Sequence, residues 1–135
     1  MPRFKTHLLI GAATGAAYSL AKQTSRQNPH MECSLEICPV HIAASAAAAA
    51  IGSCIPDMVE PANRKTGPNH RGSLHSFLSM AIGIKTTHFL ATCETESTPM
   101  RWVADLAGAF CAGYASHLAA DAFTPKGLSL ICKGF

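Results

Sequence analysis

Residues 104–121 read ADLAGAFCAGYASHLAAD, and this stretch decides the fold. Small side chains recur in it at every fourth position, at Ala104, Gly108, Ala112, Ser116 and Ala120. On an α-helix this spacing puts all five on one face. Such faces let helix backbones approach closely and are common in membrane helices, although alanine also suits a tightly packed soluble bundle. The stretch therefore predicts a helix in close contact with others.

Helix signals on either side of this stretch divide the rest of the chain. The helix itself is expected over residues 98–124, with its first residue as the cap and a first-turn proline after it. Three others are expected over residues 5–22, 39–52 and 73–93, the last with Ser73 as its N-cap. The 135 residues are therefore predicted to form one domain. Its fold class is all-α, a compact bundle of about four Ala/Gly-rich helices with one long loop.

Charged side chains are scarce, and this scarcity points to a membrane. They make up 14% of the chain, against roughly 25% in an average soluble domain. Residues 37–56 contain none and are long enough to cross a bilayer. His41 within this segment, and the small contribution of alanine to insertion, weigh against a spanning helix. We expect a membrane protein, either spanning the bilayer or lying on it.

The charge of the chain also limits its partners. A net charge of +3 is too small to indicate nucleic acid by itself. Arg64, Lys65 and Arg71 form a basic group, but no aromatic side chains interleave them to stack on bases. Nucleic-acid binding is therefore not expected, and the oligomeric state is left open.

The clearest chemical signal lies inside the deciding stretch, in the segment SHLAAD. His117 and Asp121 are four residues apart on a helix, so both side chains project from one face. Neutral imidazole nitrogens and carboxylate oxygens are zinc ligands. An isolated HxxxD is more often an ordinary hydrogen-bonded pair, so the motif indicates a metal only in combination with further ligands.

Such further ligands lie at helix ends and in the long 56–72 loop. His70 lies in this loop and His75 in the first turn of the next helix, with a glycine between them that allows the backbone to bend. Asp57 begins the loop, and His7 lies in the first turn of the first helix. Loops this long in a small domain are usually functional or disordered. In a chain with so little charge, this concentration predicts a metal site.

The other potential ligands are not assigned to that site. His30 lies in a polar connection, His41 opens the second helix, and His88 lies late in the third. The six cysteines include no CxxC pair, so neither a zinc ribbon nor a thioredoxin-type motif is present. The metal site is therefore expected to be built from histidine and carboxylate alone.

The order and wording of these motifs resemble the YdjM-like, LexA-regulated, inner-membrane metal-dependent hydrolases. The resemblance rests on four segments spanning nearly the whole chain: THLL at 6–9, IPD at 55–57, HRGSLHS at 70–76 and GYASHLAADAFTPKG at 113–127. It implies an inner-membrane protein whose metal-site positions are His7, Asp57, His70, His75, His117 and Asp121. A more distant similarity is to the helical zinc-dependent phospholipase C enzymes, which also use an HxxxD helix.

Two positions depart from the pattern of the resembled family. Where the family usually has a second aspartate two residues after the first, this chain has Val59, followed by Glu60. Where it favours threonine before the second loop histidine, this chain has Leu74. If the missing aspartate binds a second ion, either one ion is lost here or Glu60 substitutes for it.

These observations lead us to expect a metal-dependent hydrolase holding one or more divalent ions, most simply Zn²⁺. Such an ion lowers the pKa of its bound water to about 7. Asp57 or Asp121 is expected to ligate the ion or orient the water, and Arg71 to pair with a phosphate oxygen. The favoured substrate is a phosphoester or lipid-like small molecule at or in the membrane. The alternative is a non-catalytic membrane protein whose structural metal site is closed by four protein ligands.

Overall fold

The computed structural model describes residues 4–26, 37–60, 73–94, 97–124 and 127–130. Within these ranges the elements are α1 (Phe4–Ser25), α2 (Pro39–Val59), the 3-10 helix η2 (Ser73–His75), α3 (Phe77–Thr92) and α4 (Thr98–Ala122). The only β-type pairing among them is one isolated bridge between Ser76 and Ser129. The predicted all-α bundle of four helices is confirmed.

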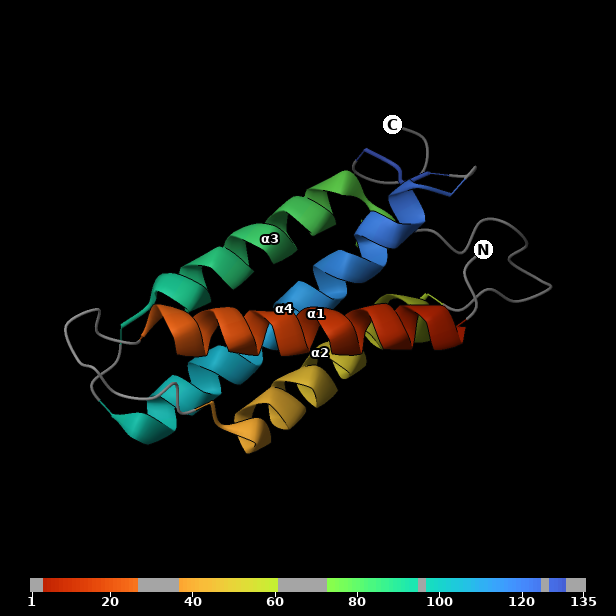
Figure 1. Ribbon diagram of the computed structural model, residues 1–135. Coiled ribbons are helices and arrows are strands. Elements are labelled where there is room, and N and C mark those ends of the chain that lie inside the picture. The colour runs from red at the N-terminus through yellow and green to blue at the C-terminus, as the bar shows by residue number, and fades with distance from the viewer. Residues whose placement is uncertain (1–3, 27–36, 61–72, 95–96, 125–126, 131–135) are drawn as a thin grey trace.

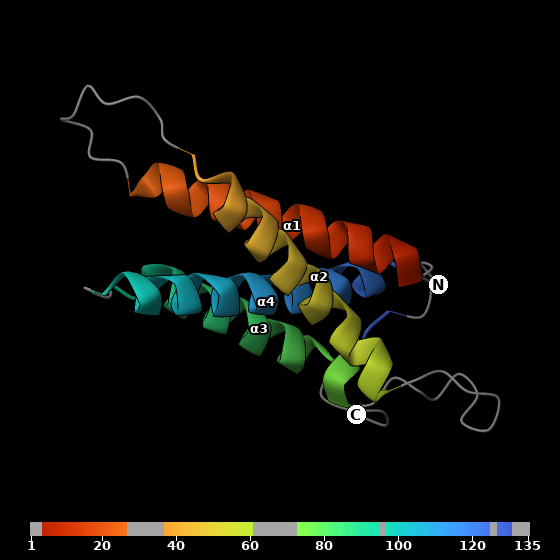
Figure 2. The ribbon, with the colours of Figure 1, turned by 90° about the horizontal axis from the view of Figure 1, so that it is seen from below.

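The helix that contains the deciding stretch, α4, is the centre of the bundle. It contacts α1, α2 and α3, and α1 and α2 also pack against each other. Figures 1 and 2 show α1 and α2 on one side of α4 and α3 on the other. Three neighbours around one helix require small side chains on more than one of its faces, which explains its composition.

Small residues bring the helix backbones into direct contact. A Cβ atom added to Gly113 of α4 would lie 1.9 Å from the carbonyl oxygen of Ala49 in α2. One added to Gly15 of α1 would lie 2.3 Å from the carbonyl oxygen of Ser45, also in α2. Only glycine fits such approaches, because a real Cβ never comes so close to a backbone oxygen.

The buried face of α4 differs from the predicted one by one position. Its buried stripe has the same four-residue spacing and consists of Asp105, Ala109, Gly113, His117 and Asp121. Of the small residues predicted for this role, Gly108 is buried, whereas Ala104 and Ser116 are only half-buried. The reason is that the ionisable side chains point inward, where α1 and α2 supply their polar partners.

Three helix ends also differ from the prediction. α2 continues through Pro56 to Val59, so Asp57 lies in the last turn of the helix and not after it. Ser76, not Ser73, is the N-cap of α3, because its hydroxyl accepts a hydrogen bond from the Ser79 amide at 3.1 Å. The N-cap of α4 is Ser97, one residue before the expected cap.

The bundle is polar inside and apolar outside. Its buried side chains include four histidines and two aspartates, at His7, His41, His75, His117, Asp105 and Asp121. Large apolar side chains on all four helices are exposed, among them Leu9, Val40, Ile51, Phe89 and Val103. Within the described ranges α2 is the one helix long and apolar enough to cross a membrane, with a mean hydropathy of 1.5. This distribution suits a lipid surround, where polar groups must find their partners inside the protein.

Candidate metal centre

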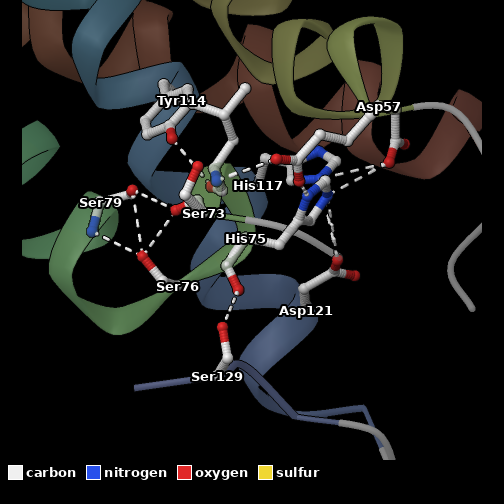
Figure 3. Close-up of polar contacts among 11 residues, drawn as sticks. Asp57, Ser73, His75, Ser76, Ser79, Tyr114, His117, Asp121 and Ser129 are labelled. Atoms are coloured by element: carbon white, nitrogen blue, oxygen red, sulfur yellow. Dashed lines mark hydrogen bonds and ion pairs between the residues drawn. The ribbon is translucent and has the colours of Figure 1, made fainter. Parts of the chain in front are cut away.

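Four predicted metal ligands converge at one end of the bundle (Figure 3). Asp57 comes from the last turn of α2, His75 from η2, and His117 and Asp121 from one face of α4. Nε2 of His75 lies 3.5 Å from Oδ1 of Asp57 and 3.4 Å from Nε2 of His117. Nε2 of His117 lies 3.7 Å from the same Asp57 oxygen. Both imidazole nitrogens lie 3.8 Å from Oδ2 of Asp121.

His7 adds a third imidazole from the first turn of α1. Its Nε2 lies 3.7 Å from the second oxygen of Asp121, Oδ1. Its ring lies against that of His117, with ring centroids 4.0 Å apart. His7, Asp57 and His117 also bring one donor atom each within 4.8 Å of one another. Five of the six predicted metal-site residues therefore lie together, and the sixth, His70, falls outside the described residues.

Each aspartate forms, together with His75 and His117, a triad of donor atoms whose spacing is close to that of ligands around one tetrahedral ion. Ligand atoms about 2.0–2.2 Å from a zinc ion lie about 3.3–3.6 Å from one another, because a tetrahedron's edge is about 1.6 times its centre-to-corner distance. The five distances given above for the first four residues run from 3.4 to 3.8 Å. Nδ1 of His7 and Nδ1 of His117 are also buried without a hydrogen-bond partner in the part of the chain described. Residue types and spacing both fit a zinc-like ion.

Burial separates these four residues into two kinds. The side chains of His75 and His117 are 0% exposed and that of Asp121 is 2% exposed. The side chain of Asp57 is 31% exposed. Three potential ligands are therefore shielded, and Asp57 is the one that a molecule arriving from solvent meets first.

Glu60 orients His75, a role that the sequence pattern did not assign to it. Its Oε2 lies 2.9 Å from Nδ1 of His75, and its Oε1 accepts a hydrogen bond from the Leu74 amide at 3.2 Å. When Nδ1 donates its proton to Glu60, the lone pair of Nε2 faces the other ligands. Burial lowers the pKa of His75, but the hydrogen bonds that its ring donates to Asp57 and Glu60 outweigh burial and raise the pKa above its usual value. The same carboxylates would attract a metal cation in place of that proton.

Hydrogen bonds to the backbone of η2 and of the residues next to it hold η2 in place. The hydroxyl of Tyr114 donates to the carbonyl of Leu74 at 2.9 Å, and that of Ser129 donates to the carbonyl of His75 at 3.3 Å (Figure 3). The amide of Phe77 donates to the carbonyl of Ser129 at 2.9 Å. These supporting residues carry no metal-ligand signature in the sequence. Tyr114 and Ser129 do lie in or just beyond the GYASHLAADAFTPKG segment, which was the only sequence signal for them.

Three other residues considered in the sequence analysis, one arginine and two histidines, are not part of this cluster in the described structure. Arg71, predicted to pair with phosphate, lies outside the described residues. His41, left out of the metal site, is indeed far from it, at the opposite end of the buried face. There its Nδ1 lies 2.7 Å from the Ser19 hydroxyl and its Nε2 3.2 Å from Asp105. His88 is exposed on α3.

A bundle with an apolar exterior, a polar interior and one candidate spanning helix is a helical membrane protein. The chain belongs to the YdjM inner membrane protein family, whose family model matches residues 1–132. It is therefore a protein of the inner membrane, as the resemblance implied. No curated protein and no solved structure matches the chain. The distant similarity to phospholipase C accordingly stays a prediction.

Proposed function

We propose that this inner-membrane protein is a metal-dependent hydrolase acting on a phosphoester or lipid-like substrate. The observation that carries the proposal is the convergence of Asp57, His75, His117 and Asp121 from three elements, with the donor atoms of the two histidines 3.4 Å apart and each 3.5–3.8 Å from an oxygen of either aspartate. Packing alone does not explain why residues far apart in the sequence bring together donor atoms that are all imidazole nitrogens or carboxylate oxygens. Buried histidines and acids in membrane helices also mark functional sites as a rule.

In this proposal the three shielded residues, His75, His117 and Asp121, hold the ion. A bound Zn²⁺-like ion supplies Lewis-acid activation of water at neutral pH. Asp57 completes the site, and its exposed position suits it to accept the proton of the attacking water. Arg71 follows directly after His70 in sequence, and we assign it to the anionic oxygens of a phosphoester.

A second candidate function is a structural metal site in a non-catalytic membrane protein. The observation in its favour is the number of candidate donors: Asp57, His75, His117 and Asp121 are four, as many as close a structural zinc site. The two candidates differ in the role of Asp57. In the hydrolase Asp57 is a proton acceptor or an exchangeable ligand, whereas in the structural site it is a permanent fourth ligand.

The decisive experiment measures metal content and hydrolysis on the same purified protein. Elemental analysis of the detergent-solubilised protein is expected to find a stoichiometric divalent metal. Assays with chromogenic phosphomonoesters and phosphodiesters are expected to show turnover that a chelator abolishes. His117→Gln is expected to lose both metal and turnover, because one of the shielded donors is removed.

The matched control is His88→Gln, the same substitution on an exposed histidine of α3. It should keep both metal and turnover. Unchanged metal content in folded His117→Gln would refute the metal site. Stoichiometric metal without turnover on any phosphoester would favour the structural alternative.

A further inference from the structure

A pocket of about 540 Å³ lies at the end of the bundle away from the metal centre. It is formed by the last turn of α1, the end of α3 and the first turn of α4. Figure 1 shows these three helix ends together, opposite the start of α1 and the end of α4. On α4, Arg101 and Asp121 are 20 positions apart, which corresponds to about 30 Å along a helix. The pocket is therefore a separate site.

Positive charge dominates the described lining of this pocket. Three of its residues are basic, Lys22, Arg26 and Arg101, and one is acidic, Glu94. Beneath them lies Asp105, whose side chain is 1% exposed. Three fixed positive charges against two negative ones leave a surplus in the pocket, even with the buried carboxylate counted.

Contacts with the buried carboxylate of Asp105 hold two of these basic side chains in place. Both terminal nitrogens of Arg26 bind the carboxylate of Asp105, at 2.6 and 3.0 Å. The ammonium of Lys22 lies 3.8 Å from Asp105 and donates to the carbonyl of Ala91 at the end of α3. The Arg26 side chain remains 36% exposed. Anchored cations of this kind lose little conformational freedom when an anion arrives.

We propose that this pocket binds an anionic phosphate group, carried by a phospholipid headgroup or by a soluble phosphate compound. Paired guanidinium and ammonium groups are the usual protein donors to phosphate oxygens. The pocket and the candidate metal centre lie at opposite ends of α4. Basic pockets between the helices of membrane proteins bind anionic lipid headgroups.

The test titrates phosphate-bearing probes into the whole protein in neutral detergent. Trp102, the only tryptophan of the chain, follows Arg101 in sequence and contacts His41 with ring centroids 4.8 Å apart. Its fluorescence therefore reports on this end of the bundle. Phosphatidylglycerol is expected to change it saturably and phosphatidylcholine to leave it unchanged. A parallel titration with inorganic phosphate shows whether the soluble anion alone is enough.

Two matched variants decide the outcome. Arg101→Gln removes an exposed cation that lines the pocket and is expected to weaken binding at least about tenfold, the effect of losing one charged hydrogen bond. Lys85→Gln removes the same charge from an exposed site on α3 outside the pocket and is expected to change affinity less than twofold. Binding of phosphatidylglycerol alone identifies a lipid headgroup site, and binding of phosphate that excludes phosphatidylglycerol identifies a soluble ligand. No saturable binding of either probe, or equal effects of the two variants, would overturn the proposal.

Discussion

The two ends of the buried face of α4 have the same kinds of buried residues, but the partners of these residues differ. Each end has one buried aspartate of α4 beside a buried histidine. At one end, Asp105 contacts a guanidinium, an ammonium and the imidazole of His41. At the other end, the carboxylate of Asp121 lies beside the imidazoles of His7, His75 and His117.

This difference teaches which carboxylate is available to an outside ion. Guanidinium and ammonium groups are permanent cations that offer no lone pair, so they compensate a buried carboxylate and exclude a metal. Imidazole nitrogens offer lone pairs, so a carboxylate among them belongs to a set of metal donors. The same residue type therefore has a structural role at one end of α4 and is a candidate ligand at the other.

The largest effect is expected from replacing each aspartate by asparagine. Asp121→Asn should weaken metal binding by more than about 100-fold. Even the mutation of a residue that only hydrogen-bonds to a metal ligand lowers metal affinity by about 10–100-fold. Asp105→Asn should leave the metal content of the folded protein unchanged but lower its free energy of unfolding by about 3 kcal/mol, because buried cations lose their partner. Elemental analysis and thermal unfolding of both variants give the two readouts. Similar metal losses in both variants would show that the ends do not differ as described.

A smaller effect is expected midway between the two ends, at Gly113. Gly113→Ala should lower the free energy of unfolding by about 1–3 kcal/mol, as overpacking does, because the new Cβ would meet the Ala49 carbonyl oxygen at 1.9 Å. Since α4 must shift from α2, metal affinity should fall as well. Gly83→Ala is the control, because its nearest neighbour is a ring atom of Tyr114 at 3.2 Å. It should destabilise much less than Gly113→Ala, because a side-chain ring can shift by a few tenths of an ångström where a helix backbone cannot, and equal destabilisation by both variants would contradict the close packing of α2 on α4.

The fold was predictable where small residues recur at four-residue spacing, because this spacing indicates close helix packing. The four-residue repeat on α4 indicated close helix packing, and glycines in direct backbone contact confirm it. The buried stripe was misplaced by one position because composition alone favoured the small side chains over Asp105 and His117. Helix ends were missed for local reasons, since a proline usually ends a helix, whereas the buried Pro56 lies inside α2.

The candidate ligands could be picked out from the sequence, but not their arrangement. The HxxxD spacing of His117 and Asp121 fixes a shared helix face in any context. Asp57 and His75 stood out by their positions next to the long loop, but nothing in their local sequence says that the end of α2 and η2 lie at the same place. The hydrogen bond of Glu60 to Nδ1 of His75 depends on ring orientation, which only the three-dimensional arrangement defines.

The smallest effect, and the sharpest test of the metal-binding end, is expected from Glu60→Gln. Glutamine keeps an oxygen for the Leu74 amide but removes the charge behind His75. If Glu60 only orients His75, zinc affinity should fall about tenfold with unchanged stoichiometry. This is the usual effect of mutating a residue that hydrogen-bonds to a metal-ligating histidine. Glu94→Gln, at the opposite end, should leave zinc affinity unchanged. A complete loss of one ion in Glu60→Gln would instead identify Glu60 as a ligand that replaces the missing family aspartate. The candidate metal centre would then extend beyond Asp57, His75, His117 and Asp121.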